Sequence, residues 1–211
     1  MAVSTGSFQS SFRLSLPRHE RRHGWLSLLL DCYACIDASV AGSIAAAQEP
    51  VACHEGCTSC CRHSIPLSPL EALGLGFCVR ELLPPAARAA LQARQGQAVR
   101  PGDLCPFNLG GSCSVYALRP IACRRYLVCG QPCQAGESPL HTRPQAVLHP
   151  SRISLRRAVA LTMPFYAASG HRLQPGQDPL DFYLARNISL AEVWPGLCSG
   201  LSSAPAGGGE S

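Results

Sequence analysis

Apolar residues recur at helical spacing in one long stretch near the start of the chain. Separations of three and four residues place six side chains on one face: Trp25, Leu29, Cys32, Ile36, Val40 and Ile44. This period predicts an amphipathic helix. Glu49-Pro50 should end it, because the residue before a proline avoids the helical backbone conformation.

A second helix is predicted to start at Ser68-Pro69-Leu70-Glu71. Ser68 can act as the N-cap, Pro69 fits the first helical position, and Glu71 completes a capping box. Four apolar side chains then share a face: Leu70, Leu73, Phe77 and Cys78. The segment from Pro85 to about Gln95 is rich in Ala, Leu and Arg, which predicts a further helix.

The C-terminal third carries three more helical signals. An amphipathic helix is predicted from Arg152 to Tyr166. Its inward face is Leu155, Val159, Met163 and Tyr166, and its outward face is Arg152, Arg156 and Arg157. Asp178-Pro179-Leu180-Asp181 starts another helix, and Ser189 with Glu192 gives a capping box for a last short turn before Pro195.

Residues 100–150 show no such period and are rich in Pro, Gly and Cys, which predicts an irregular segment. Gly110-Gly111 can turn a short hairpin, and in a regular hairpin Cys105 and Cys113 would point to opposite faces. If both bind one metal, we expect a knuckle there instead. The fold class predicted is mostly α, with several short amphipathic helices around an irregular, cysteine-rich, metal-binding region.

The same patterns suggest how the chain is organised. Residues 1–22 lack periodicity and are expected to form a flexible N-terminal arm. Residues 23–196 should form a single cysteine-cluster metal-binding domain, with its motif core at 50–135. Residues 197–211 are mostly Ser, Ala, Pro and Gly, which predicts a disordered tail.

The chain contains 13 cysteines among 211 residues. A chain of this length can build a hydrophobic core and does not need disulfides to replace one. Arginines precede an apolar run as in a secretion signal, but Asp31 and Asp37 interrupt that run early. We therefore expect no membrane span and a cytoplasmic protein, in which clustered thiols are reduced and available to a metal.

Nine of the cysteines fall into two groups with metal-ligand spacing. The first group is Cys53, Cys57, Cys60 and Cys61, and the second is Cys105, Cys113, Cys123, Cys129 and Cys133. Short spacings let successive thiolates converge on one ion, so these nine are the candidate ligands. The expected cofactor is zinc or iron, including a [4Fe–4S] cluster. Cys32, Cys35, Cys78 and Cys198 are interpreted as core or incidental residues, and His54 and His63 flank the first group.

The formal charge of +5 comes from 18 arginines and no lysine. Thiolates bound to a metal would be balanced locally by Arg119, Arg124 and Arg125. Aromatic residues make up only 6% of the chain, which argues against a nucleic-acid-binding surface. A metal ion is therefore the expected partner, and a protein partner stays undefined.

The cysteine motifs also resemble a known family. They are Cys53-His-Glu-Gly-Cys57-Thr-Ser-Cys60-Cys61, then Cys105-Pro106-Phe107, then Gly111-Ser-Cys113-Ser-Val-Tyr116-Ala-Leu-Arg119-Pro120-Ile-Ala-Cys123-Arg124. In order and spacing they resemble the YkgJ-type cysteine-cluster (CxxCxxCC) family of zinc- or iron-chelating domains, although Cys53 and Cys57 are separated by three residues rather than two. The resemblance covers roughly residues 50–135. It implies Cys57, Cys60, Cys61, Cys105, Cys113 and Cys123 as ligands, and Cys53, Cys129 and Cys133 as further candidates.

The resemblance implies no reaction, so the enzymatic question stays open. The larger flagellin lysine methylase is similar in its cysteine cluster. Cys53-x₃-Cys57-x₂-Cys60 also has the spacing of radical enzymes that hold a [4Fe–4S] cluster with S-adenosylmethionine, but those need a barrel of alternating strands and helices. A maturation factor or a redox sensor would also fit clustered thiols beside arginines. No catalytic constellation is visible, and a non-enzymatic metal-binding role is favoured.

Overall fold

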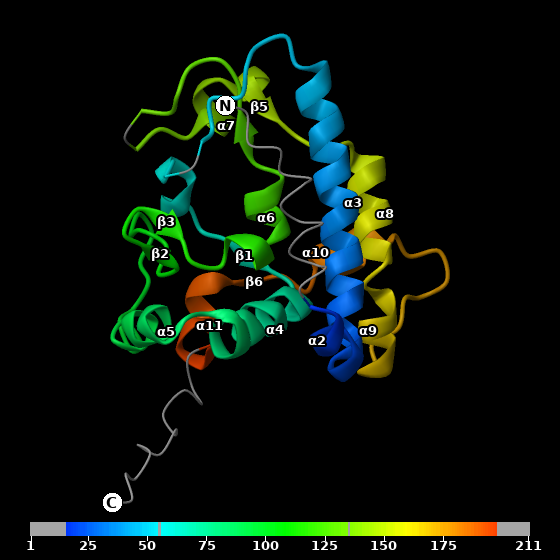
Figure 1. Ribbon diagram of the computed structural model, residues 1–211. Helices are drawn as coiled ribbons and strands as arrows, with labels where there is room; N and C mark the ends of the chain where they lie inside the picture. Colours follow the sequence, from blue (N-terminus) through cyan, green and yellow to red (C-terminus); the bar gives the residue numbers. More distant parts are fainter. Residues whose placement is uncertain (1–15, 55, 135, 198–211) are drawn as a thin grey trace, which may run out of the picture.

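The computed structural model describes residues 16–54, 56–134 and 136–197. The fold is mostly α, as predicted (Figure 1). The α-helices are α2 (Pro17–Arg22), α3 (Gly24–Ala46), α4 (Pro69–Phe77), α5 (Pro85–Gln92), α6 (Ile121–Arg124), α7 (Pro139–Thr142), α8 (Arg152–Ala160), α9 (Met163–Ala168), α10 (Pro179–Leu184) and α11 (Leu190–Leu197). Shorter helical turns of other types are η1 (Ser59–Arg62), η2 (Cys78–Leu82), η3 (Tyr116–Leu118) and η4 (Pro144–Ala146).

The strands of the described residues form three two-stranded antiparallel ladders. They pair β1 (Pro66–Leu67) with β6 (Ile188–Ser189), β2 (Asn108–Leu109) with β3 (Ser112–Cys113), and β4 (Leu127–Val128) with β5 (Val147–Leu148). The first ladder joins Pro66 to Ser189, so it fixes the C-terminal helix against the middle of the chain. No barrel of alternating strands and helices occurs in these ranges.

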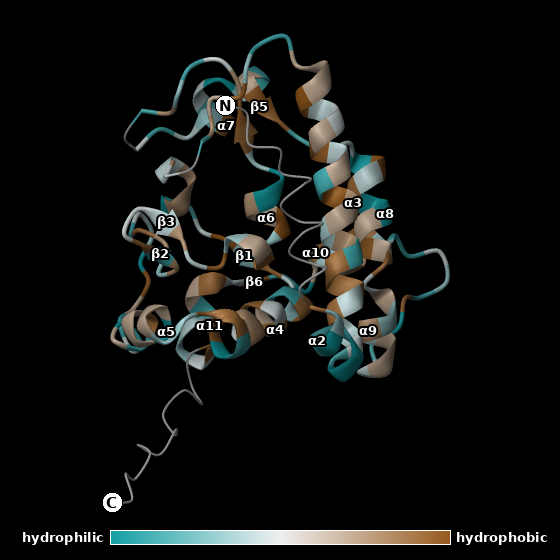
Figure 2. Ribbon diagram, in the orientation of Figure 1, coloured by the Kyte–Doolittle hydropathy of each residue, from teal (hydrophilic) through white to brown (hydrophobic). Residues whose placement is uncertain are grey.

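Helix α3 is the longest helix of the described residues, and the middle of the predicted apolar stripe lies on its buried face, whereas Trp25 and Ile44 at the two ends are half-buried. Its buried residues are Leu26, Leu29, Leu30, Cys32, Tyr33, Ile36, Asp37 and Val40. It packs against α4, α6 and α8. In Figure 2 apolar residues run along α3, α4 and α11, whereas α2 is mostly hydrophilic. Helix α3 thus contributes one side of a hydrophobic core that the later elements complete.

Helix α3 is long and apolar enough to cross a membrane by length and composition, although Asp31 and Asp37 interrupt its apolar run. The core helix of a soluble protein and a signal sequence have the same properties. Here Asp37 lies on the buried face and pairs with Arg124, in contact with the rest of the fold. The expectation of no membrane span stays a prediction.

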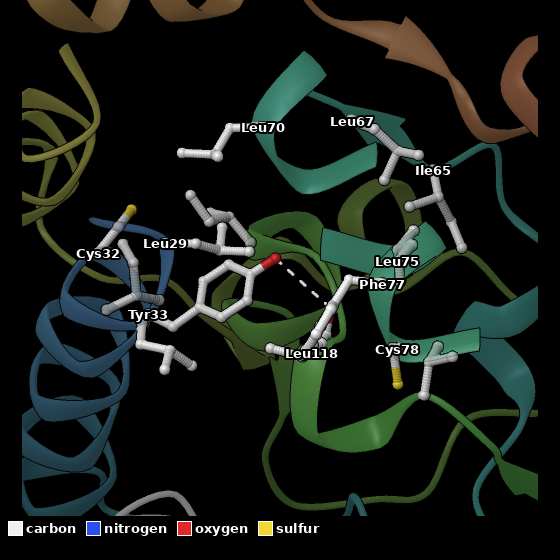
Figure 3. Close-up of a cluster of buried hydrophobic side chains, with 14 of the residues drawn as sticks. Leu29, Cys32, Tyr33, Ile65, Leu67, Leu70, Leu75, Phe77, Cys78 and Leu118 are labelled. Carbon is white, nitrogen blue, oxygen red and sulfur yellow. Dashed lines mark hydrogen bonds between the residues drawn. The ribbon is translucent and has the colours of Figure 1, made fainter. Parts of the chain in front are cut away.

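Helix α4 begins with the predicted capping box. The Ser68 hydroxyl accepts the Glu71 N–H at 3.3 Å, and the Glu71 carboxylate accepts the Ser68 N–H at 2.8 Å. One buried position differs from the prediction: Leu73 is half-buried, and Leu75 is fully buried instead. Figure 3 shows Leu75 and Phe77 in the core with Leu29 and Leu70, where the Tyr33 hydroxyl donates to the Leu118 carbonyl at 3.4 Å.

The helix predicted from Arg152 to Tyr166 is two helices, α8 and α9. Pro164 stands in the first turn of α9, where its missing N–H is tolerated. Within a continuous helix the same proline would remove a hydrogen bond and clash with the preceding turn. The buried face is otherwise as predicted, except that Met163 is only half-buried. At the C-terminus, α11 continues through Pro195 to Leu197 instead of ending before the proline.

Part of the segment predicted to be a flexible N-terminal arm is helical. Residues 17–22 form α2, and Leu16 is 2% exposed within the hydrophobic core. The His19 and His23 rings pack edge-on against Phe77, with centroids 5.3 and 5.5 Å away. These contacts hold α2 against the fold despite its polar sequence. The rest of the predicted arm and the tail from residue 198 lie outside the described residues.

Candidate metal centre

The candidate ligands are held by the irregular middle of the chain, between α3 and α8. Cys60 and Cys61 lie in η1, Cys113 in β3 and Cys123 in α6. The remaining five lie in loops or turns: Cys53, Cys57, Cys105, Cys129 and Cys133. The Cys105 N–H donates to the Cys61 carbonyl at 2.7 Å, which joins the two sequence groups directly. The twelve cysteines of the described residues are free thiols.

Cys60 interacts electrostatically with thiols of both groups. Burial raises the pKa of five other cysteines, and a negative charge on Cys60 raises each of them further: Cys53, Cys105, Cys113, Cys123 and Cys133. Cys60 and Cys123 also line the same cavity. Together with the hydrogen bond from Cys105 to Cys61, these interactions place cysteines of both groups in one region of the fold.

Four of them form an inner group, Cys60, Cys105, Cys113 and Cys123. Burial raises the pKa of Cys105 to about 11 and that of Cys123 well above its usual range. The thiols of Cys105 and Cys113 each interact with the backbone N–H two residues further on, at Phe107 and Val115, which lowers their pKa in part. Amide donors placed in this way stabilise a thiolate.

Cys113 lies in the second strand of a hairpin, the structure that Gly110-Gly111 predicts; a knuckle was expected only if Cys105 and Cys113 bind one metal. Gly110 and Gly111 make its turn with φ values of 60° and 86°, which only glycine adopts easily. Asn108 pairs with Cys113 across the ladder. Cys105 lies in the turn before β2, where its carbonyl accepts the Asn108 N–H at 2.9 Å. Because Cys105 is outside the ladder, strand alternation does not separate it from Cys113.

The outer group contains Cys53, Cys57 and Cys133, from two loops far apart in the sequence. Burial raises the pKa of Cys53 to about 11, while the Val128 N–H, which donates to its sulfur at 3.3 Å, lowers it in part. A negative charge on Cys57 raises the pKa of both Cys53 and Cys133. Cys60 raises the pKa of the same two thiols, so it is common to the inner and the outer group.

Cys61 is linked to Cys60, whereas Cys129 interacts with none of these thiols. A hydrogen bond between the Cys60 and Cys61 side chains, with burial, raises the pKa of Cys60 well above its usual range. Cys129, by contrast, is influenced only by burial and by the Glu49 carboxylate. A β-bridge to Val51 fixes its backbone. These interactions link eight of the nine candidate cysteines, which we call the thiol cluster, and none of them involves Cys129.

Arg119 is the cation that accompanies the thiol cluster. Its charge lowers the pKa of Cys60, Cys113 and Cys123. Its Nε atom is buried and has no hydrogen-bond partner among the described residues. Its guanidinium lies 4.0 Å from the centroid of the Tyr116 ring. If the nearby thiols became negatively charged, the Arg119 guanidinium could stabilise them and still donate a hydrogen bond through Nε.

Arg124 was expected to balance the thiolates as well, but it has another principal partner. It lowers the pKa of Cys113, yet its guanidinium is bonded to the Asp37 carboxylate at 2.8 Å and to the Arg119 carbonyl at 2.8 Å. The Arg124 side chain is 1% exposed. Sequence reasoning missed Asp37, whose only signal was an acid on the apolar stripe of the first helix.

The donor set suits zinc, iron or an iron–sulfur cluster, because thiolates are the soft ligands that these centres take. The positions of these donor side chains fit a metal site less well than their chemistry does. Within residues 16–54, 56–134 and 136–197, no three or more His, Cys, Asp or Glu side chains stand in an arrangement that could hold a metal ion. His54, a flanking candidate, bonds through Nδ1 to the Ala52 carbonyl at 3.0 Å.

Cys32, predicted to be a core residue, is fully buried in α3. Burial, with the Glu71 charge, raises its pKa well above the usual range. Folding thus favours the neutral thiol, so this contribution to stability is complete below the unfolded pKa of about 8.5 and is lost as the pH rises toward the folded value. We expect Cys32→Ala to reduce the fall of the free energy of unfolding above pH ~9 by about 1.4 kcal/mol per pH unit. Urea titrations from pH ~8 to ~11 measure this slope, and parallel slopes for the two proteins would contradict it.

The chain was compared with known proteins in three ways. No family model, no curated protein and no solved structure matches it. The resemblance to the YkgJ-type family therefore remains a prediction from the motifs.

Proposed function

We propose that this protein binds zinc, iron or an iron–sulfur cluster through the thiolates of the thiol cluster. The observation that carries the proposal is the hydrogen bond from the Cys105 N–H to the Cys61 carbonyl, at 2.7 Å, which joins the two cysteine groups. A charge on Cys60 also raises the pKa of five other candidate thiols. Thiols that influence one another in this way repel once ionised, and a metal cation removes that repulsion. Arg119 supports the proposal, because it supplies a positive charge beside the same thiols.

The proposed ligands are Cys53, Cys57, Cys60, Cys61, Cys105, Cys113, Cys123 and Cys133. Since these thiols do not stand in a coordination arrangement among the described residues, metal binding requires them to close together. Part of the binding free energy is then folding free energy, as in other small metal-organised domains. When bound, zinc would organise the fold, and an iron–sulfur centre would add redox chemistry. We place the protein in the cytoplasm, where such thiols stay reduced.

The test is metal analysis of the full chain purified without oxygen. We expect a stoichiometric metal, identified by quantifying Zn, Fe and acid-labile sulfide and by recording the visible spectrum. Cys60→Ser should lose most of the metal and become less soluble, because it removes a proposed ligand and the folding energy that the metal supplies.

Cys129→Ser is the matched control, since it removes a buried cysteine that lies apart from the thiol cluster. It should keep its metal, and so should Cys32→Ala. Unchanged metal content in Cys60→Ser, or equal loss in all three variants, would contradict the ligand assignment.

A further inference from the structure

A cavity of about 350 Å³ adjoins the thiol cluster. Its wall is formed by the segment that follows η1, by the segment from α6 toward β4, by α7, and by His149. Its volume lies within the range of about 300–1,000 Å³ that is typical of small-molecule sites. Cys60 and Cys123 of the thiol cluster line one part of it.

The charged and titratable groups of this wall are basic, apart from the thiols and a tyrosine. Arg125, His63, His141 and His149 line the cavity, and no Asp or Glu does. Arg125 makes no ion pair within the part of the chain that the structure describes. It lies near His149, because its positive charge adds to burial in lowering the pKa of that imidazole.

The acidic residue that is closest in sequence to the cavity residues is already paired with other side chains. Glu137 precedes the cavity residue Ser138, but its carboxylate is held by Arg143 at 2.8 Å and by the Thr142 hydroxyl at 2.8 Å. Its charge is thus compensated outside the cavity. Arg125 therefore keeps a positive charge that no carboxylate of the wall balances, and this charge attracts anions.

The remaining wall offers both apolar surface and hydroxyl groups. Ile65, Ala122 and Leu140 are apolar, and Ser138 and Tyr126 carry hydroxyls. Sites for small organic molecules combine these features, with an apolar lining and a few polar groups that orient the ligand. A guanidinium suits carboxylate and phosphate groups in particular, because it can donate two parallel hydrogen bonds to them.

We propose that this cavity binds a small organic anion, a carboxylate or a phosphate monoester, with Arg125 as the principal anchor and His141 and His149 as further donors. The inference goes beyond metal binding and does not depend on it. A ligand held there would lie against Cys60 and Cys123. The cavity would then give a substrate or regulator direct access to the thiol cluster.

Isothermal titration calorimetry on the reduced full chain at low salt tests the proposal, with phenyl phosphate, benzoate and neutral benzamide as probes. We expect one or both anions to bind at one site per chain, more tightly than benzamide, and more weakly as salt is added. Binding of phenyl phosphate alone would assign a phosphate ligand, and binding of benzoate alone a carboxylate. Arg125→Gln should weaken anion binding by at least about tenfold. Arg157→Gln, an exposed arginine of α8 outside the cavity, should leave it unchanged.

Arg125 is two residues from Cys123, so the metal content of each variant is measured in parallel. His141→Gln gives a second, independent reading, because His141 is an exposed residue of α7 away from the cysteines in sequence. Its anion affinity should fall while the metal content stays constant. Equal affinity for benzamide and both anions, or unchanged anion binding in both Arg125→Gln and His141→Gln, would overturn the proposal. Loss of metal from Cys60→Ser would still support the metal site in that case.

Discussion

Replacing Glu71 by alanine is expected to lower the free energy of unfolding by about 3–5 kcal/mol. The Glu71 side chain is 1% exposed and accepts three hydrogen bonds. The donors are the Ser68 N–H at 2.8 Å, the Ile121 N–H at 2.7 Å and the Tyr183 hydroxyl at 2.5 Å. Alanine would leave all three in a buried site without their acceptor, and each such loss costs about 1–3 kcal/mol.

Urea unfolding at neutral pH, followed by circular dichroism, measures this effect. Glu71→Gln should cost less than alanine, because it keeps the shape of the side chain and one carbonyl oxygen. Glu81→Ala is the control, since Glu81 is an exposed acid of η2, and it should change stability by no more than about 0.5 kcal/mol. A similarly small effect for Glu71→Ala would show that the buried hydrogen bonds contribute little.

Glu71 also illustrates how far the sequence could predict this fold. The capping box at Ser68 and Glu71 is a local pattern, so it was visible in the sequence and is confirmed. The bonds from the same carboxylate to Ile121 and Tyr183 join residues 50 and 112 positions apart, for which the sequence carries no local signal. Helices α3 and α10 were predicted for the same reason as the capping box, because period and capping are local properties.

The differences between the predicted and the observed helices have two kinds of physical cause. Pro164 was a local signal for a break between α8 and α9 that the apolar period concealed. The helix at residues 17–22 was missed because its position depends on Leu16 and on rings packed edge-on against Phe77, which are tertiary contacts. Hydrophobic periodicity in the sequence reveals such a contact only when the helix that makes it has an apolar face.

The candidate site also combines features that local sequence patterns can predict with features that depend on tertiary contacts. Spacing predicted that thiols from two groups would converge on a metal, which stays a prediction, although Cys60 raises the pKa of both Cys105 and Cys123. Spacing could not separate Cys129 from Cys133, since both follow the same irregular segment. The bridge between Val51 and Cys129 and the neighbouring Glu49 distinguish them, and both depend on the return of the chain toward the end of α3.

The buried ion pair between Arg124 and Asp37 is the second contact for which we expect a large effect. It joins α6 to α3, and the side chains are 1% and 8% exposed. The Tyr33 ring adds to it, with its centroid 3.9 Å from the Arg124 guanidinium carbon. Arg124→Met should cost about 3–5 kcal/mol, because it leaves the Asp37 carboxylate buried without its cation.

A double-mutant cycle in urea separates the pair from its neighbours. Arg124→Met with Asp37→Leu should recover much of the stability lost in Arg124→Met, because removing both charges removes the cost of an unpaired one. The exposed pair between Arg156 and Asp178, at 3.2 Å, is the matched control, and Arg156→Met should cost less than about 1 kcal/mol.

Because Arg124 follows Cys123 directly, the cycle also tests whether α3 positions the thiol cluster. Arg124→Met should lose metal, and the double variant should regain part of it. An Arg124 effect as small as that of Arg156 would mean that the ion pair contributes little to holding α6, and Cys123 with it, and that apolar packing and the bond from Ile121 to Glu71 hold it instead.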